Sequence, residues 1–259
     1  MIHLYDANNV MRRAMEAGLP GSERMSLRMR YESLMLEPPG SQIWVWDGYQ
    51  HNERRRDIYP KYKLNRSPTP TDIFSQIKLW REVLKHSHAT QIDVHGWEAD
   101  DVISTMARRF VSMGIPVTIH TNDMDYGQMA HLPGVTLSGV NLKGVPGRWI
   151  ALYKAMTGDK SDNIDGIPGF GPKRWLELED HWPQIERAIV LGDPAGFVGL
   201  PFKPAVAGWL ANADNIRLLQ QMLTITHFEN VPDDELEGGI IEGVPDRRAA
   251  HDRLAEFFL

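Results

Sequence analysis

The stretch Gln42-Ile-Trp-Val-Trp46 decides the fold class of this chain. Its large and β-branched residues carry no charge and stop at an aspartate, which predicts a short strand buried on both faces. Ile2-His-Leu-Tyr5 is a second run of this kind and also stops at an aspartate. The segments 9–17 and 23–36, between the two runs, have helical composition. A strand, helices and a further strand indicate parallel pairing of the two strands.

Two more apolar runs continue this alternation. Gln91-Ile-Asp-Val94 precedes an amphipathic stretch, 97–113, with apolar residues at helical spacing, and Pro116-Val-Thr-Ile-His120 follows it. We therefore expect residues 1–145 to form an α/β core with a mostly parallel, doubly wound sheet. In such sheets ligands bind at the carboxyl ends of the strands.

From about residue 146 the strand signal fades. Residues 146–259 are expected to form a helical part that is continuous with the core, without a flexible linker. At its end, Leu254, Phe257 and Phe258 are expected to dock an amphipathic segment on the body. The expected helices are 147–157, 172–180, 184–191 and 204–221, and only 223–226 could return to the sheet.

Composition excludes several classes of protein. The 259 residues include 28 Lys and Arg, 34 Asp and Glu, no Cys and 42% hydrophobic residues. The formal charge of −6 excludes a uniformly basic nucleic-acid coat, and the lack of Cys excludes disulfide frameworks and thiolate sites. No apolar run approaches the ~20 residues of a membrane span, and the N-terminus lacks a signal-peptide pattern. We expect a soluble cytoplasmic protein without membrane partners.

Carboxylates gather where the predicted strands and helices meet their loops. Singly, each has an ordinary explanation, because acids favour helix starts and aspartates form Asx turns. Together they would converge on one edge of the sheet, where they repel one another unless cations neutralise them. Oxygen donors without Cys or His select hard ions such as Mg²⁺ or Mn²⁺, and their number suggests two ions. The acids are Asp6, Asp47, Glu98, Asp100, Asp101, Asp123, Asp125, Asp159 and Asp162.

These acids belong to an ordered series of motifs that resembles the 5′ nuclease family. That family comprises bacterial and bacteriophage 5′→3′ exonucleases, the 5′ nuclease domain of bacterial DNA polymerase I, and flap endonucleases. Each motif alone is weak, whereas six in the right order over about two thirds of the chain are specific. The motifs are Asp6, Trp46-Asp47-Gly48, Arg55 ahead of Tyr62-Lys63-Leu-Asn-Arg66, Glu98-Ala-Asp-Asp101, Thr121-Asn-Asp-Met-Asp125 and Gly158-Asp-Lys-Ser-Asp-Asn163.

The resemblance implies a PIN-like sheet and two bound Mg²⁺ ions, which Mn²⁺ could replace. Asp159 and Asp162 would complete the second metal site, and Asp101 would hydrogen-bond behind the ligands. Asp6 and Asp47 would act directly in catalysis. The ligands on the first metal side would be Asp6, Asp47, Glu98, Asp100, Asp123 and Asp125.

A basic segment, 53–66, carries six positive and two negative side chains. Alone it could be a solvated loop, but after a metal-binding strand it suits a phosphate backbone, with Tyr59 and Tyr62 available for base stacking. The resemblance makes 53–90 a short arch over the active site. Lys63 and Arg66, three apart on one helix face, would contact the scissile phosphate. The other expected DNA contacts here are Arg54, Arg55, Arg56, Lys61 and Tyr62.

A glycine-rich segment, Gly166-Ile-Pro-Gly-Phe-Gly-Pro-Lys173, follows the last acids. Gly169 and Gly171 allow a tight turn that presents backbone N–H groups to a phosphate, although a plain turn between helices is the alternative. The segment resembles the family's helix-hairpin-helix, here near 158–180, which grips duplex backbone and can bind K⁺ through carbonyl groups. Lys160 and Lys173 would add phosphate contacts.

The sequence therefore predicts a Mg²⁺-dependent 5′→3′ exodeoxyribonuclease and flap endonuclease with a two-metal-ion mechanism. Its substrates would be DNA with 5′ ends, flaps or single-strand/duplex junctions, with RNA primers as further candidates. We expect a monomer in the cytoplasm of a bacterium or a phage-infected host, acting in DNA replication or repair. Two alternatives stay open. One is a PIN-type ribonuclease, against which the hairpin argues; the other is a branched-DNA-binding protein without catalysis, against which the full acid set argues.

Overall fold

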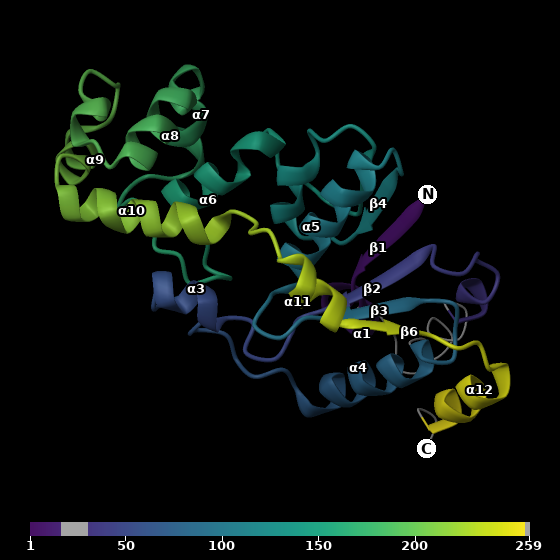
Figure 1. The fold of residues 1–259 in the computed structure, drawn as a ribbon. Helices are drawn as coiled ribbons and strands as arrows, with labels where there is room; N and C mark the ends of the chain where they lie inside the picture. The colour runs from purple at the N-terminus through teal and green to yellow at the C-terminus, as the bar shows by residue number, and fades with distance from the viewer. Residues whose placement is uncertain (17–30, 257–259) are drawn as a thin grey trace. The chain divides into compact units, whose positions relative to one another are not determined.

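The computed structural model describes residues 1–16 and 31–256, which form two compact units (Figure 1). The first unit contains Met1–His51, Pro68–Asn141 and Glu229–Leu259. The second contains Asn52–Ser67 and Leu142–Phe228. Each unit is therefore assembled from segments that are far apart in the chain.

The first unit is built on a six-stranded sheet with the order β5-β4-β1-β2-β3-β6. Every pairing is parallel except the last, where β6 runs antiparallel to β3. This confirms the predicted mostly parallel sheet. The strands are β1 (Ile2–Asp6), β2 (Gln42–Trp46), β3 (Thr90–Asp93), β4 (Val117–His120), β5 (Val135–Ser138) and β6 (Ile240–Glu242).

Both faces of this sheet are covered, as its sequence pattern requires. All five residues of β2 are buried, and its side chains alternate between the two faces. Trp44 and Trp46 pack in one apolar cluster with residues of α1 (Ala7–Glu16), α4 (Thr71–Leu84) and α12 (Arg247–Glu256). Figure 1 shows α5 (Ala99–Ser112) on the other side, where it contacts β1, β2 and β4. This layering is the doubly wound α/β arrangement.

The sheet edges were missed by sequence analysis. The strand β5 alternates between intermediate and exposed residues, and β6 is exposed throughout, so neither carries the apolar pattern of a buried strand. An edge strand needs to bury little of its surface, so its sequence carries no apolar pattern from which it could be predicted. The predicted helix over 23–36 begins outside the described residues, and its residues 31–34 are helical.

The second unit is helical and has its own apolar core. Trp175, Trp182, Ile185, Leu219 and Met222 are among the side chains of that core. The predicted helix over 204–221 is two helices, and the chain at 223–226 continues the second of them, so the suggested strand there is wrong. Its helices are α3 (Glu53–Ile58), α6 (Ile150–Thr157), α7 (Pro172–Leu176), α8 (Trp182–Leu191), α9 (Pro204–Leu210) and α10 (Ala213–Thr226), with short 3-10 turns at Gly147–Trp149, Glu179–His181 and Pro194–Phe197.

The division of the chain differs from the expected split at residue 145. The segment 52–67 belongs to the helical unit, and 229–259 returns to the sheet unit. The return begins at α5, where Asp101 Oδ1 accepts a hydrogen bond from the backbone N–H of Glu229 (2.8 Å). After α11 (Asp233–Gly238) it adds β6 and α12.

The docking of the C-terminal segment is confirmed at Leu254, which is buried against the α4 side of the sheet unit. Phe257 and Phe258, which were expected to dock with it, lie outside the described residues. Among the residues that the structure describes, no helix is long and apolar enough to cross a membrane.

Arg55 anchors the basic segment inside the helical unit. Its side chain is only 4% exposed, its Nε donates to the carbonyl of Ile225 (2.9 Å), and its Nη2 donates to that of His227 (3.4 Å). These carbonyls lie at the C-terminal end of α10, where backbone oxygens lack helical partners and a cation is favourable. Arg55 therefore ties α3 to α10 and is buried away from any external phosphate, which corrects its expected role as a DNA contact.

Replacing Arg55 tests this anchor. We expect Arg55→Met to lower the free energy of unfolding by about 2–4 kcal/mol, because two buried carbonyl groups lose charged donors. The exposed Arg54 on the same helix provides the matched control, and Arg54→Met should change the free energy by less than about 0.5 kcal/mol. Urea denaturation of both variants measures the difference, and equal effects would contradict the assignment.

Candidate active site

Three acids stand at neighbouring strand ends of the sheet unit. Asp6 is the last residue of β1, Asp47 follows β2 directly, and Asp123 comes three residues after β4 ends. The strands β4, β1 and β2 are adjacent and parallel, so their carboxyl ends meet at one edge. The fold therefore brings these three segments to the same edge of the sheet.

Asp6 and Asp123 are linked through Thr121. Asp6 is buried, and its Oδ2 accepts a hydrogen bond from the Thr121 hydroxyl (3.0 Å). The same hydroxyl oxygen accepts the backbone N–H of Asp123 (3.1 Å), and Asp123 Oδ1 accepts that of Asp125 (2.9 Å). Asp6 Oδ1 also accepts the N–H of Asn9 at the start of α1 (3.2 Å). Backbone and hydroxyl donors thus hold these carboxylates in place.

Asp47 is fixed at the beginning of α5. Its Oδ1 accepts the backbone N–H of Ala99 (3.0 Å), and its Oδ2 accepts the side-chain amide of Asn8 (2.6 Å). Asp47 thus accepts a backbone N–H at the N-terminus of a helix, where such groups lack helical partners. Glu98 is the buried residue immediately before α5, and Asp100 lies in its first turn. The helix start thus gathers three acids from two segments.

The acids of this unit perturb one another electrostatically. Burial, and after it the negative charges of Asp47 and Asp123, raise the pKa of Asp6 to about 7, although the hydrogen bonds from Asn9 and Thr121 act in the opposite direction. Burial also raises the pKa of Tyr126 well above 10, with the charges of Asp100 and Asp6 acting in the same direction. A carboxyl group that holds its proton near neutral pH marks a place where added negative charge is costly and a cation is favourable.

The donor set suits a hard divalent ion. As the described side chains lie, however, no three Asp, Glu or His residues are arranged to hold one metal ion together. Asp6 and Asp47 are instead turned toward hydrogen-bond donors on Thr121, Asn8 and Ala99. Their oxygens fit Mg²⁺ or Mn²⁺ in chemistry, and a carboxylate can accept such hydrogen bonds and bind an ion with its remaining lone pairs.

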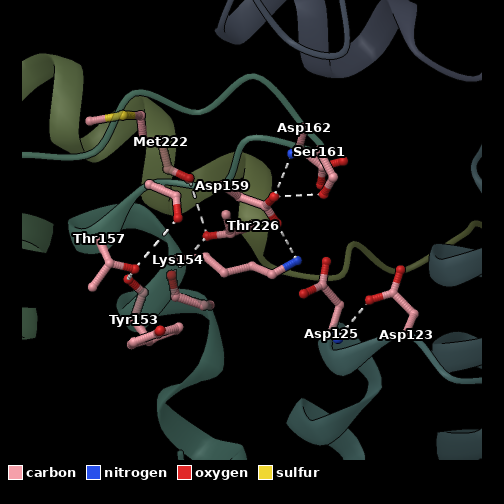
Figure 2. A network of polar contacts seen from close by, with 12 residues as sticks. Asp123, Asp125, Tyr153, Lys154, Thr157, Asp159, Ser161, Asp162, Met222 and Thr226 are labelled. Atoms are coloured by element: carbon pink, nitrogen blue, oxygen red, sulfur yellow. Dashed lines mark hydrogen bonds and ion pairs between the residues drawn. The ribbon is translucent and has the colours of Figure 1, made fainter. Parts of the chain in front are cut away.

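Asp159 and Asp162, in the helical unit, are paired with cations of the chain itself. Asp159 Oδ2 lies 2.7 Å from Lys154 Nζ, and its Oδ1 accepts the N–H and hydroxyl of Ser161 at 2.8 and 2.6 Å, as Figure 2 shows. Burial raises the pKa of Asp159, but Lys154 and Ser161 outweigh that effect and bring it to about 2. Asp162 Oδ1 accepts Arg66 Nη2 at 2.6 Å. Each of the two acids therefore contacts a cationic side chain of the same unit.

Lys63 and Arg66 lie in a turn after α3, not on the predicted helix face. The helix α3 ends at Ile58, and Lys63 has a left-handed backbone with φ of +53°. Lys63 is only 9% exposed, and its Nζ lies 4.7 Å from the centre of the Tyr62 ring. Its backbone N–H donates to the carbonyl of Asp162 (2.9 Å). The turn thus lies directly against the loop that contains the last acids.

Further hydrogen bonds fasten the basic segment to this loop. Asn65 Nδ2 donates to the carbonyl of Lys160 (2.7 Å), and Arg66 Nε donates to that of Ser161 (3.1 Å). Lys61 Nζ forms an ion pair with Asp165 (2.7 Å), which also accepts the hydroxyl of Tyr59 (3.1 Å). Two distant segments of the sequence therefore form one rigid surface of the helical unit.

The two tyrosines of the basic segment are not available for base stacking. Tyr59 and Tyr62 are 2% and 3% exposed and belong to the apolar core of the helical unit. This corrects the expected stacking and the assignment of Tyr62 as a DNA contact, because the ring faces pack against protein. Arg54 is exposed, Lys61 is largely exposed, and Arg56 donates its Nε to the carbonyl of Tyr62 (3.0 Å).

Glycine closes the loop that leads to the hairpin. A Cβ at Gly166 would lie 2.4 Å from the backbone nitrogen of Gly158, so the two chain segments approach as closely as backbones can. Gly169 has φ of +74°, which glycine adopts without strain. Gly171 is extended, and a Cβ there would meet nothing within 4 Å. Lys160 and Lys173 are exposed nearby in sequence.

Several residues that organise these sites were not predicted from the sequence. Thr121 and Asn8 hold the acids of the sheet unit, and Lys154 and Asp165 hold the loop of the helical unit. Thr121 is the first residue of the motif Thr121-Asn-Asp-Met-Asp125, so the sequence offered a signal for it. Lys154 and Asp165 carried no local signal, because an ion pair is visible only once the two partners are placed.

The sequence of this chain is similar to those of known proteins of one family. Residues 3–144, more than half of the chain, match the model of the 5'-3' exonuclease N-terminal resolvase-like domain. The DNA polymerase I of Rhizobium leguminosarum is 34% identical over 153 residues, which are 54% of this chain and 15% of that protein. The 5'-3' exonuclease of Aquifex aeolicus is 30% identical over 174 residues, or 63% of this chain and 60% of that protein. The chain thus matches less than two thirds of the length of these relatives.

Solved structures share the fold at low sequence identity. A structure of the bacteriophage T5 5'-exonuclease with bound zinc ions has a TM-score of 0.66 and 17% identity, and the match covers 99% of this chain and 98% of that one. The bacteriophage T5 flap endonuclease, solved with DNA and metal ions, has a TM-score of 0.61 and 16% identity over 99% of this chain and 97% of that one. The shared fold, and above all the match of residues 3–144 across the strand ends that carry Asp6, Asp47 and Asp123, lead to one conclusion: the chain belongs to the 5'-3' exonuclease family.

Proposed function

We propose that this protein is a Mg²⁺-dependent 5′→3′ exodeoxyribonuclease and structure-specific flap endonuclease. The observation that carries the proposal is the set of acids at the adjacent ends of β4, β1 and β2, where burial and neighbouring charge raise the pKa of Asp6 to about 7. Such a set is chemically suited to divalent cations. Family membership and the DNA-bound flap endonuclease with the same fold support a nucleic-acid phosphodiester as the substrate.

In this proposal the acids of the sheet unit hold one divalent ion, and Asp159 and Asp162 contribute to a second. Bound ions of this kind activate water and stabilise the attacking and leaving oxygens of a phosphodiester displacement. The α5 N-terminus and Asn8 orient Asp47, while Thr121 orients Asp6, so the ligands start from defined positions. Asp101 accepts the backbone N–H of Glu229 and so holds α5 against the returning C-terminal segment. The ligands proposed for the first ion are Asp6, Asp47, Glu98, Asp100, Asp123 and Asp125.

The helical unit is proposed to hold the DNA. Lys63 and Arg66 would supply positive charge to the scissile phosphate, and the firm docking of their turn on the loop at 159–165 keeps that charge in place. Arg54, Arg56, Lys61 and Lys160 would contact the sugar-phosphate backbone. The hairpin at 166–173, with Gly169, Gly171 and Lys173, would grip duplex without reading sequence and could take K⁺.

The function is tested directly with a labelled 5′ flap. We expect purified protein with Mg²⁺ or Mn²⁺ to cleave flap DNA near the single-strand/duplex junction and to leave 5′-phosphorylated products. The same flap made of RNA and a blunt duplex serve as controls for substrate class and structure. No cleavage of any DNA substrate with either ion would overturn the proposal, and cleavage of RNA alone would indicate a ribonuclease.

A second prediction concerns Lys63. We expect Lys63→Met to lower the single-turnover cleavage rate about 100-fold or more while the Kd for flap DNA changes less than about threefold, because an ammonium that acts on developing charge contributes mainly in the transition state. The methionine keeps the stem packed beside Tyr62. Lys173→Met, in the exposed hairpin, provides the contrast, since loss of a backbone contact should weaken binding more than the rate. Equal losses of rate and affinity in Lys63→Met would contradict this role.

A third prediction follows from the raised pKa of Asp6. Its pKa is about 7 in the fold and 3.8 ordinarily, so between these values the folded state binds the additional proton. The free energy of unfolding of the metal-free protein should therefore fall as pH rises from 4 to 7, by up to about 1.4 kcal/mol per pH unit from this group. Asp6→Asn should remove that dependence and raise the thermal midpoint at pH 8, while abolishing cleavage.

The control and the metal titration sharpen this prediction. The exposed Asp57 on α3 is the matched carboxylate, and Asp57→Asn should leave both the pH dependence of stability and cleavage unchanged. Because a protonated Asp6 cannot bind an ion, Mg²⁺ should raise the thermal midpoint of the wild type more at pH 8 than at pH 6. A wild-type midpoint that Mg²⁺ shifts equally at both pH values would exclude Asp6 as a ligand with this pKa.

A further inference from the structure

We propose that Tyr49 and His95 form a stacking platform for an unpaired nucleobase of the substrate, beside the cleaved phosphodiester. The proposal rests on the nuclease function proposed above and adds a base-binding site to it. It starts from the burial of Tyr59 and Tyr62, because these two rings of the basic segment cannot stack on a base of the substrate. Among the Phe, Tyr and Trp side chains that the structure describes, Tyr49 is the most exposed, at 75%, followed by Phe74, at 60%.

The backbone under Tyr49 is held firmly by two loops that interlock. The loop after β2 and the loop after β3 exchange hydrogen bonds, from Gly48 N–H to the Trp97 carbonyl (3.0 Å) and from Gly96 N–H to the Tyr49 carbonyl (2.8 Å). A Cβ at Gly48 would lie 1.8 Å from the carbonyl oxygen of Val94, so only glycine permits this approach. The residues on both sides of Tyr49 are thus fixed, and little backbone freedom is left to lose on binding.

The turn that follows Tyr49 is closed as well. The backbone N–H of His51 bonds the carbonyl of Gly48 (3.3 Å), and His51 Nδ1 lies 2.8 Å from the same oxygen. Gln50 has a left-handed backbone, with φ of +58°. An exposed ring on a mobile loop needs no explanation, since single apolar residues are common on surfaces. The Tyr49 ring, by contrast, is exposed although the backbone on both sides of it is fixed by hydrogen bonds.

A second ring extends the platform. His95 is exposed, and its ring centre lies 5.7 Å from that of Tyr49, with the ring planes at 50°. The two side chains come from different loops and together present adjoining aromatic faces. Base–aromatic stacking tolerates any base and contributes roughly 1–3 kcal/mol per base, which suits an enzyme that selects structure and not sequence.

The platform lies beside the proposed metal ligands. Asp47 is two residues before Tyr49, and Glu98 is three residues after His95. Both loops leave the carboxyl ends of adjacent parallel strands, β2 and β3, and so share the edge that carries the acids. In this proposal, a nucleotide whose phosphate meets those acids brings its base, or that of its neighbour, to the rings.

Variants at Tyr49 test the platform on flap DNA. Tyr49→Ala should lower kcat/KM roughly 5- to 150-fold, which corresponds to the loss of one stacked base, whereas Tyr49→Phe should stay within about threefold of the wild type. His95→Ala should show a smaller loss than Tyr49→Ala. An exposed ring outside the proposed site provides the control, and His131→Ala, in the loop before β5, should cleave as the wild type does. All these side chains are exposed, so equal thermal midpoints establish that the variants fold.

A set of substrates with one abasic nucleotide at successive positions identifies the base. At one position the missing base should cost the wild type about the same factor as Tyr49→Ala, and it should cost Tyr49→Ala nothing further. An independent measurement uses 2-aminopurine at that position with the protein in EDTA, where the wild type and Tyr49→Phe should quench its fluorescence more than Tyr49→Ala does.

The outcomes separate the platform from the nuclease function. If Tyr49→Ala cleaves and quenches as the wild type does, the platform is rejected and the nuclease function stands. If the abasic cost is the same in the wild type and in Tyr49→Ala, the rings do not contact the base and the platform is likewise rejected. If the wild type cleaves no DNA substrate, the proposed function fails, and the platform fails with it.

Discussion

The burial of Asp6 beside other carboxylates is the constraint on which this structure depends. Parallel strands β4, β1 and β2 bring Asp123, Asp6 and Asp47 to one edge, and burial there raises the pKa of Asp6 to about 7. The surrounding fold offsets part of that cost with fixed donors, namely the start of α5, Asn8 and Thr121. These donors allow the unit to fold with its acids in place, at the expense of stability as pH rises. A chain selected for stability alone would replace such a cluster, which is why its presence indicates function.

The helical unit handles its acids differently. Asp159 and Asp162 have their own cations, Lys154 at 2.7 Å and Arg66 at 2.6 Å, and the pKa of Asp159 is about 2. The Arg66 pairing also connects the basic turn to the loop of the last acids, so charge balance and geometry are achieved by the same contact. The two units thus show two ways of holding these carboxylates, by uncharged hydrogen-bond donors in the sheet unit and by ion pairs in the helical unit.

Local patterns in the sequence predicted much of the fold. The runs at 2–5, 42–46, 91–94 and 116–120 became β1 to β4, since a short uncharged run followed by a turn has few other stable arrangements. The edge strands β5 and β6 escaped, because they bury little and so carry no pattern. Charge near the strand ends indicated the candidate acids. The charge and aromatic content of 53–66 predicted DNA contacts for Arg55, Tyr59 and Tyr62, but all three side chains are buried.

The sequence by itself determined the class of the sheet, the acids at its strand ends and the family, since each depends on the order and spacing of residues. Tertiary structure alone decided which basic and aromatic side chains reach the surface. Arg55 is buried because it donates to the carbonyl of Ile225. That partner lies 170 residues further along the chain, so no local pattern encodes the contact. Tyr49 is exposed on a backbone that the hydrogen bonds of Gly48 and Gly96 fix between two loops from different strands. Burial is a property of the partners that a residue finds, and those partners are fixed only when distant segments pack together.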